Sequence, residues 1–295
     1  MKEILFTGSG VALVTPFDEN RNINYEELEK LIEFQIENKT DAIIACGTTG
    51  ESSTMTEKEH LDVIGFIIDK VAGRIPVIAG TGSNDTRTAV ELSVHAKELG
   101  ADGILLITPY YNKTSQKGLV EHYNYIANEA KIPAIVYNVP SRTGLNILPE
   151  TYLEISKNPY IVATKEANGN AGALAHTISL CGNNLHVYSG EDNMTLPIIA
   201  MGGLGIISVF ANALPKEMHN LAQAALDGDL AAARALSNEY LDLMDGFFMD
   251  VNPIAIKDAM NQMGLVCGPC RMPLTSMTDA NHAKMQALLQ KHGLI

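Results

Sequence analysis

Several features are missing from this sequence, and each absence excludes a class of protein. No apolar run approaches the roughly 20 residues that a membrane-spanning helix needs. Basic residues are scarce: 21 Lys and Arg stand against 34 Asp and Glu, which gives a formal net charge of −13. This balance argues against nucleic acid and anionic membranes as partners, because both bind basic patches. Residues 1–17 include Glu3 and no long apolar core, so we expect no signal peptide and a cytoplasmic protein.

Motifs for metals, nucleotides and redox cofactors are also missing or incomplete. The chain has no P-loop and no GxGxxG after its first predicted strand. Its four cysteines are expected to be free thiols in a cytoplasmic protein. Cys267 and Cys270 form a CxxC pair, but no second pair or HxxxH completes a zinc site, and the pair falls in a predicted loop. We therefore expect no metal, nucleotide or flavin, and the sequence assigns no role to this pair.

Eight short segments of continuous apolar residues recur along the chain. Continuous rather than alternating hydrophobicity is typical of parallel strands covered by helices. The predicted strands span residues 10–17, 42–50, 76–82, 103–111, 133–140, 160–169, 186–192 and 203–212. Amphipathic segments lie between them, for example residues 24–38 and 86–100, and the second of these ends at Gly100, a typical helix stop.

This order of segments predicts the fold class. Eight strand-and-helix units at intervals of roughly 20–35 residues are typical of an α/β protein with a (β/α)8 TIM barrel, here over residues 1–225. An open doubly wound sheet fits less well, because eight units is the number that closes a barrel and the dinucleotide motif is missing. Residues 226–295 are helical in pattern, and no Pro/Ser-rich linker precedes them. We expect a C-terminal helical extension packed on the barrel.

Functional side chains of such barrels gather at the carboxyl ends of the strands, where the sixth predicted strand ends in Lys165. Desolvation there lowers the pKa of an ammonium group and frees the amine to attack a ketone. The resulting imine acts as an electron sink for a carbanion at the adjacent carbon. Few acidic groups are expected nearby. The alternative is that Lys165 and Glu166 form a solvated surface pair after the strand has ended.

Other strand ends supply hydroxyl groups. The segment GTTGESSTMTEKEH (47–60) is predicted as a turn into a helix, with a capping box from Thr54 to Glu57. Backbone N–H groups and the hydroxyls of Thr48 and Thr49 could hold a carboxylate at this turn. The alternative is an ordinary turn that happens to contain two threonines.

Two further side chains are candidates for proton transfer and for anion binding. Tyr137 follows a buried-looking segment, and its hydroxyl could move protons during imine chemistry. Arg142 lies in the predicted loop PSRTG and could hold a second carboxylate through two parallel hydrogen bonds. The alternatives are a tyrosine of the core and a solvated arginine.

Five motifs occur together in one order: GTTGE, TPYYNK, YNVPSRTG, KEANG and GIISV. In these motifs, and over essentially its whole length, the chain resembles the dihydrodipicolinate synthase (4-hydroxy-tetrahydrodipicolinate synthase) family of the pyruvate-dependent aldolase superfamily. The resemblance implies a Schiff-base-forming lyase that condenses pyruvate with L-aspartate 4-semialdehyde in the biosynthesis of diaminopimelate and lysine. It also implies no external cofactor, since the lysine imine forms with the substrate, and a homotetramer built as a dimer of dimers.

The resemblance further implies roles for individual residues. Lys165 matches the lysine that forms the Schiff base, and Tyr137 matches the proton donor and acceptor. Thr48 and Tyr111 match its partners in a hydroxyl relay, with Tyr111 supplied by a neighbouring subunit. The positions that match substrate contacts are Thr49 and Ile207 for pyruvate, Arg142 for the carboxylate of the semialdehyde, and Gly190.

Some members of the family are inhibited by lysine at the tight-dimer interface. The positions that match this site are Ser52, Ser53, Glu57, His60, Asn84, Thr88 and Tyr110. Inhibited members often carry histidine and glutamate where this chain has Glu57 and Thr88. The loss of a carboxylate at Thr88 removes a partner for the ligand's ammonium group, so we expect weak or absent lysine feedback.

Three other functions remain open from the sequence. A sister aldolase that cleaves N-acetylneuraminate or a 2-keto-3-deoxy sugar acid would share Lys165 and Tyr137. Arg142 and the adjacent pair Tyr110 and Tyr111 favour a compact acidic aldehyde instead. A non-catalytic barrel that binds a small carboxylate should have lost the lysine or the tyrosine. A structural or scaffolding protein would leave the clustering of these groups at the strand ends unexplained.

Overall fold

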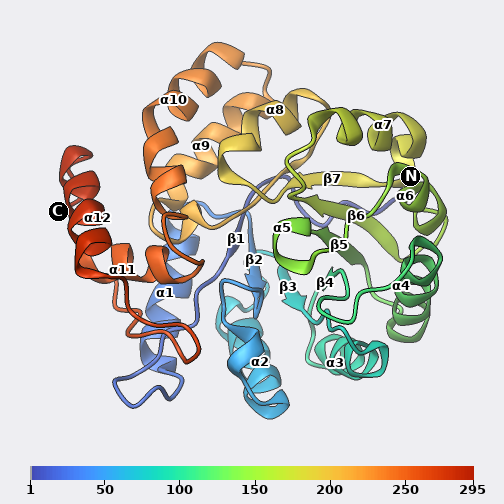
Figure 1. Cartoon of the computed structure of the whole chain (residues 1–295), viewed down its shortest axis with the longest axis horizontal. Coiled ribbons are helices and arrows are strands. Elements are labelled where there is room, and N and C mark those ends of the chain that lie inside the picture. Colours follow the sequence, from blue (N-terminus) through green and yellow to red (C-terminus); the bar gives the residue numbers. More distant parts are fainter. Residues whose placement is uncertain (1) are drawn as a thin grey trace.

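Eight parallel strands close into a barrel in the structure, a computed structural model that describes residues 2–295 (Figure 1). Each strand pairs with its neighbour in the sequence, and β8 closes the sheet against β1. The predicted TIM barrel is therefore confirmed. The strands are β1 (Gly8–Ala12), β2 (Ala42–Ala45), β3 (Val77–Gly80), β4 (Gly103–Ile107), β5 (Ala134–Asn138), β6 (Ile161–Glu166), β7 (His186–Ser189) and β8 (Gly205–Ser208).

The strands are shorter than the apolar segments that predicted them. The first prediction, residues 10–17, is also shifted, because β1 starts at Gly8 and ends at Ala12. Leu13 and Val14 lie beyond the strand but are only 2% and 1% exposed. Loops at the carboxyl rim of the barrel are buried beneath other segments, so apolar residues continue past the ends of the strands.

Helices surround the barrel and continue beyond its last strand (Figure 1). Their bounds are α1 (Tyr25–Glu37), α2 (Glu57–Val71), α3 (Thr86–Glu98), α4 (Gln116–Ala130), α5 (Pro140–Thr143), α6 (Pro149–Ile155), α7 (Ala171–Cys181), α8 (Thr195–Ala200), α9 (Pro215–Leu226), α10 (Leu230–Gly246), α11 (Ile254–Gln262) and α12 (Asp279–Lys291). Single turns of 3₁₀ helix lie at η1 (Ser52–Thr54), η2 (Gly182–Asn184), η3 (Asp192–Met194) and η4 (Phe210–Asn212). No helix among residues 2–295 combines the length and the apolarity that crossing a membrane requires.

The predicted capping box of the second long helix is wrong by two residues. Thr56 is the N-cap of α2. Its hydroxyl oxygen accepts from the backbone N–H of Glu59, and the Glu59 carboxylate accepts from the backbone N–H of Thr56. Thr54 belongs to the preceding 3₁₀ turn, where its hydroxyl donates to the carbonyl of Glu51. The extra turn delays the start of the helix, so the same Thr-to-Glu spacing is used two positions later.

Two large hydrophobic clusters hold the barrel together, one inside it and one between its strands and the helices, and a small third cluster is formed by Leu174, Val187 and Ile198. Inside the barrel, Phe6 precedes β1 and stacks on Tyr188 of β7 with the ring centroids 4.4 Å apart. The Tyr188 hydroxyl donates a 2.6 Å hydrogen bond to the carbonyl of Phe6. These two rings fill the interior of the barrel below its carboxyl rim. The open end of the barrel is therefore at the carboxyl ends of its strands.

The C-terminal helices pack on the barrel, as the sequence predicts. In Figure 1, α10 lies against α8 and α9, and α12 packs against α10 and α11. We propose residues 1–225 as the barrel unit and 226–295 as the extension, since the last helix that follows a barrel strand ends at Leu226.

Candidate active site

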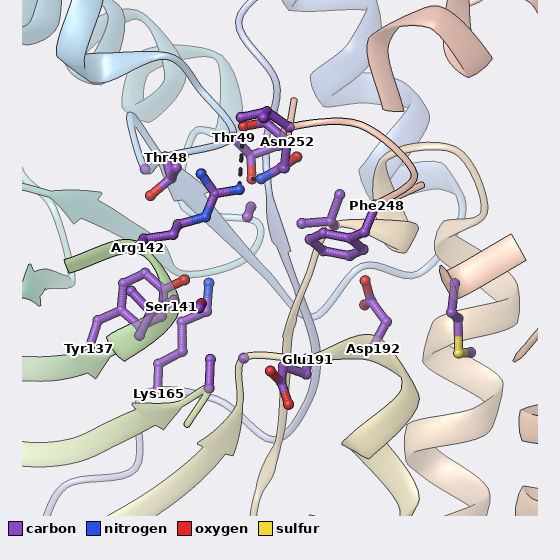
Figure 2. A pocket seen from close by; sticks show the side chains of 18 of the residues that line it. Thr48, Thr49, Tyr137, Ser141, Arg142, Lys165, Glu191, Asp192, Phe248 and Asn252 are labelled. Carbon is purple, nitrogen blue, oxygen red and sulfur yellow. Dashed lines mark hydrogen bonds between the residues drawn. The ribbon is translucent and has the colours of Figure 1, made fainter. Parts of the chain in front are cut away.

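A cavity of about 930 Å³ lies at the carboxyl ends of the strands (Figure 2). Six of the residues that the sequence predicts as catalytic or substrate-binding line it together. They come from different strands and loops: Thr48, Thr49, Tyr137, Arg142, Lys165 and Gly190. The fold therefore brings most of the predicted site into one space.

Lys165 is the penultimate residue of β6 and is buried at the base of this cavity. It is 5% exposed, and its register partner on β5 is Tyr137. Lys165 Nζ lies 4.2 Å from the centroid of the Tyr137 ring. Burial lowers the pKa of Lys165 to about 7, opposed by the negative charge of Asp192 and assisted by the positive charge of Arg142. Much more of this amine is therefore unprotonated near neutral pH than in an ordinary lysine, and the unprotonated form is the one that attacks a carbonyl carbon.

The surface-pair alternative for Lys165 and Glu166 is excluded by the structure. Successive residues of a strand point to opposite faces, and Glu166 points away from the cavity. It is 3% exposed and accepts hydrogen bonds from the Tyr152 hydroxyl at 2.7 Å and from Asn138 Nδ2 at 3.0 Å. Burial raises the pKa of Glu166 to about 7. Glu166 thus connects β6 to Tyr152 and Asn138. It does not form an ion pair with the amine of Lys165.

Gly190 provides the space in which the Lys165 side chain extends. A Cβ atom at this position would lie 3.1 Å from both Cγ and Cε of Lys165 and 2.9 Å from Cβ of Ala167. Any larger residue would displace the lysine stem. This close approach is a physical reason for glycine after β7.

The expectation of few acidic groups near the amine is wrong. Asp192 lines the cavity, is 3% exposed, and accepts hydrogen bonds from Ser208 Oγ at 2.5 Å and from the backbone N–H of Phe210 at 3.1 Å. Burial raises the pKa of Asp192, while these two hydrogen bonds and the nearby Lys165 lower it. Glu191 also lines the cavity, and its pKa is raised by burial. Both residues lie within three positions of the end of β7, so their place after a strand end is the signal that could have identified them.

The Thr48–Thr49 turn is fixed, on the side away from the cavity, by residues distant in the sequence. Glu51 has a left-handed backbone (φ 57°), and its carboxylate lies 2.8 Å from Lys257 Nζ in a buried ion pair. The second carboxylate oxygen accepts a 2.8 Å hydrogen bond from the backbone N–H of Arg271. No local pattern in the sequence pairs a βα turn with the C-terminal extension, so sequence reasoning missed this support.

Arg142 lies at the rim of the cavity, on the single helical turn α5 rather than in an irregular loop. Pro140 starts this turn and Gly144 ends it with a left-handed φ of 68°. The guanidinium remains exposed, and its Nη2 is 3.5 Å from the carbonyl oxygen of Asn252. It is close enough to the amine to help lower the pKa of Lys165. Exposure at a rim suits a group that would receive an incoming anion.

Two predicted site residues do not line the cavity of this chain. Tyr111 is 92% exposed, with a left-handed φ of 67°. Ile207 is completely buried on β8 and belongs to the core inside the barrel. Among residues 2–295, no hydrogen bond joins the Tyr137 hydroxyl to Thr48 or Tyr111, so the hydroxyl relay stays a prediction.

The chain is similar over its whole length to proteins of one family. A model of the Dihydrodipicolinate synthetase family matches residues 5–292. The chain belongs to this family. The 4-hydroxy-tetrahydrodipicolinate synthase of Caldicellulosiruptor bescii is 53% identical over 290 residues, which are 98% of each chain. The family and the type of enzyme predicted from the motifs, a Schiff-base-forming lyase, are thereby confirmed.

Solved structures of family members agree with this fold. The crystal structure of dihydrodipicolinate synthase from Aquifex aeolicus is 46% identical, with a TM-score of 0.96 over 98% of this chain and 99% of that chain. The chloride-inhibited dihydrodipicolinate synthase from Acinetobacter baumannii, solved in complex with pyruvate, is 41% identical with a TM-score of 0.96. The match covers 98% of this chain and 99% of the Acinetobacter baumannii chain.

A second cavity, of about 360 Å³, collects positions that match the family's lysine site. Six of the seven matched residues line it: Ser52, Ser53, Glu57, His60, Thr88 and Tyr110. Asn84 does not line this cavity, and its Nδ2 donates a 3.2 Å hydrogen bond to the carbonyl of Tyr110. His60 Nε2 lies 2.7 Å from the carbonyl of Gly80, and burial lowers the pKa of the imidazole. Thr48 and Tyr137 line both cavities, so the two lie side by side.

The four cysteines are buried free thiols. Cys267 and Cys270 lie in a segment without regular structure, and burial raises the pKa of each thiol to about 12. Such thiols stay protonated and are poor nucleophiles. Within residues 2–295, no group of three or more His, Cys, Asp or Glu side chains is arranged to hold a metal ion.

Proposed function

We propose that this member of the dihydrodipicolinate synthetase family condenses pyruvate with L-aspartate 4-semialdehyde through an imine on Lys165. The observation that carries the proposal is a buried lysine with a pKa of about 7 at the open end of the barrel, 4.2 Å from a tyrosine ring. The pyruvate complex of the Acinetobacter baumannii relative supports the first substrate. The name of the Caldicellulosiruptor bescii relative supports the product, 4-hydroxy-tetrahydrodipicolinate, an intermediate of diaminopimelate and lysine biosynthesis.

The first half of the reaction makes a nucleophile from pyruvate. The neutral amine of Lys165 attacks the keto carbon, and loss of water gives a protonated imine. Loss of a methyl proton then gives the enamine, with the imine nitrogen as the electron sink. We assign the proton transfers to Tyr137, because burial raises its pKa to about 12 and keeps the phenol protonated as a hydrogen donor. Thr48 and the neighbouring subunit's matching tyrosine are the proposed relay partners.

The second half joins the two substrates and releases the enzyme. The enamine carbon attacks the aldehyde carbon of the semialdehyde, whose carboxylate we assign to Arg142 at the rim. The amino group of the semialdehyde then attacks the imine carbon, closes the ring and releases Lys165 as a free amine. One water leaves overall, at imine formation. The lysine imine supplies the electron sink, so we propose that no external cofactor takes part.

Substrate positions follow from the cavity lining. We assign the carboxylate of pyruvate to the Thr48–Thr49 turn, where Thr49 is 2% exposed and the turn is fixed by the buried ion pair of Glu51. Ile207 is the proposed apolar contact beneath the substrate. Gly190 leaves room for the lysine to reach the keto carbon.

We also propose a homotetramer, built as a dimer of dimers and acting in the cytoplasm. The support from this chain is Tyr111, which is 92% exposed and has a left-handed backbone. That backbone conformation is unusual for a large side chain. A tyrosine presented in this way suits insertion into a neighbouring subunit.

A direct assay tests the proposed function. Purified enzyme is incubated with pyruvate and aspartate semialdehyde, and separately with N-acetylneuraminate or a 2-keto-3-deoxy sugar acid. We expect condensation of the first pair and no comparable cleavage of the sugar acids. Faster cleavage of a sugar acid would contradict the proposal and support the sister aldolase.

The activity should depend on pH through the amine of Lys165. Because its pKa is lowered to about 7, the reactive unprotonated fraction increases as the pH rises through this value. We expect kcat/KM for pyruvate to rise from about pH 6 and to level off near pH 8, whereas an ordinary lysine would keep gaining about tenfold per unit up to about pH 10. A pH profile at saturating semialdehyde measures this. A continued rise above pH 9 would show that the amine is not desolvated.

Free lysine should inhibit this enzyme weakly or not at all. The second cavity contains Thr88 where inhibited members often have glutamate, so the carboxylate that would meet the ligand's ammonium group at this position is missing. Steady-state rates with increasing lysine test the expectation, and Thr88→Glu is the matched variant that should gain sensitivity. Strong inhibition of the unmodified enzyme by sub-millimolar lysine would contradict it.

A further inference from the structure

Several residues of the C-terminal extension line the active-site cavity, and one of them, Asn252, contacts a residue of the proposed substrate site. Asn252 lies just before α11 and lines the cavity together with Thr49 and Arg142 (Figure 2). It is 5% exposed, so it is part of the cavity wall rather than of the surface. No motif in the sequence marks this residue.

The amide of Asn252 contacts the hydroxyl group of Thr49. Asn252 Nδ2 donates a buried 2.9 Å hydrogen bond to Thr49 Oγ1. A threonine hydroxyl can accept a hydrogen bond through its oxygen while its single hydrogen donates elsewhere. With its oxygen engaged by Asn252, the hydroxyl of Thr49 is left as a donor that points away from the amide. The cavity in which the substrate carboxylate is proposed to bind lies beside it.

The opposite orientation of the amide would remove this donor. Oδ1 carries no hydrogen, so if it faced Thr49 the hydroxyl would donate to it and have no hydrogen left for a substrate. In the observed orientation Oδ1 of Asn252 is buried and has no hydrogen-bond partner among residues 2–295. A buried carbonyl without a partner is unfavourable by itself. Because Nδ2 faces Thr49, Oδ1 does not compete for the hydrogen of the Thr49 hydroxyl.

Two further contacts fix the position of Asn252 relative to the turn. Its backbone carbonyl is 3.5 Å from Arg142 Nη2. Lys257, on the helix that follows, makes the 2.8 Å ion pair with Glu51 and also donates to the carbonyl of Thr15 at 3.1 Å. The extension thus holds the turn at two points, with Lys257 behind it and Asn252 on the cavity side.

We propose that Asn252 is a positioning residue for pyruvate: it orients the Thr49 hydroxyl so that its hydrogen faces the substrate carboxylate. The inference rests on the proposed function, in which Thr49 binds that carboxylate. The extension therefore contributes to substrate binding although it lies outside the barrel strands. Asn252 acts through Thr49, so its effect disappears when the hydroxyl of Thr49 is absent.

A double-mutant cycle tests this dependence. The measured quantity is the pyruvate concentration that gives half-maximal borohydride trapping on Lys165, in the full-length enzyme and in Asn252→Ala, Thr49→Val and the double variant. We expect each single substitution to raise this concentration about tenfold, the usual scale for a hydrogen bond to a charged acceptor. The double variant should be no worse than Thr49→Val. Effects that multiply would show that Asn252 acts independently of Thr49 and would overturn the proposal.

Two more variants separate orientation from general loosening of the extension. Asn261 lies on α11, the helix that follows Asn252, and its Oδ1 accepts from the backbone N–H groups of Cys267 and Gly268, away from the cavity. Asn261→Ala should lower thermal stability without changing the trapping concentration, and a rise as large as that of Asn252→Ala would contradict the proposal. Asn252→Asp keeps the shape but offers Thr49 only acceptors, so it should bind pyruvate more weakly than Asn252→Ala; tighter binding would also contradict it.

These outcomes are distinct from a failure of the proposed function. If the unmodified enzyme gave no pyruvate adduct on Lys165, the imine mechanism would be wrong and the cycle would have no signal. If the unmodified enzyme is trapped and the cycle is multiplicative, the mechanism stands and only the role of Asn252 is refuted.

Discussion

Lys165→Ala is expected to lose condensation activity by a factor of about 10⁴ or more, because no other side chain can form the covalent intermediate. Burial lowers the pKa of this amine, so the substitution removes a group that is easily deprotonated. No carboxylate on β6 loses an ion-pair partner. Glu166, the neighbouring carboxylate, keeps its hydrogen bonds to Tyr152 and Asn138. The fold should therefore persist. Steady-state rates together with a thermal melt measure both expectations.

Two controls sharpen this prediction. Lys165→Arg keeps a cation in place but supplies no nucleophilic amine, and it should be as inactive as Lys165→Ala. Lys117→Ala removes a lysine that is 85% exposed, and it should keep full activity. Appreciable activity in a folded Lys165→Ala variant would refute covalent catalysis by this residue.

Tyr137→Phe is expected to lower kcat by a factor of about 10²–10⁴, the usual contribution of a positioned proton donor. The substitution removes one oxygen atom from a side chain that is 7% exposed and leaves the ring packed against Lys165 Nζ. The pKa of this phenol is raised to about 12, so the group lost is a protonated hydroxyl rather than a charge. KM for pyruvate should change much less than kcat, because the carboxylate contacts remain.

Tyr123→Phe is the matched control for Tyr137→Phe. Tyr123 on α4 is also buried, and among residues 2–295 its hydroxyl has no hydrogen-bond partner. Tyr123→Phe also removes a buried phenol oxygen, but one that lies outside the cavity, so kcat should be unchanged. Equal losses in the two variants would mean that Tyr137 supports packing rather than proton transfer.

The barrel and the position of its candidate catalytic lysine could be predicted because both depend on local patterns. Parallel strands buried on both faces read as continuous apolar segments, and Lys165 follows directly after one of them. The exact ends of the strands could not be predicted in this way. Leu13 and Val14 are buried in a loop at the rim, so hydrophobicity continues where strand pairing stops.

Contacts between distant segments explain what the sequence did not reveal. Glu51 and Lys257 are charged residues that would ordinarily be placed on a solvated surface, yet the folded chain buries them together at 2.8 Å. Asn252 meets Thr49 only because the extension folds back over the barrel. Asp192 was at a strand end and could have been selected, but its buried carboxylate accepts a hydrogen bond from Ser208 of a different strand, a contact that the sequence does not reveal. Such pairings are set by tertiary structure and leave no periodic signal.

The central claim is that one buried amine forms an imine with pyruvate, and reductive trapping tests it most directly. The enzyme is incubated with pyruvate and borohydride, digested, and searched by mass spectrometry for the reduced adduct. We predict a single modified residue, Lys165, and no adduct in Lys165→Ala. An unmodified Lys165, or an adduct on another lysine that persists in Lys165→Ala, would contradict the account.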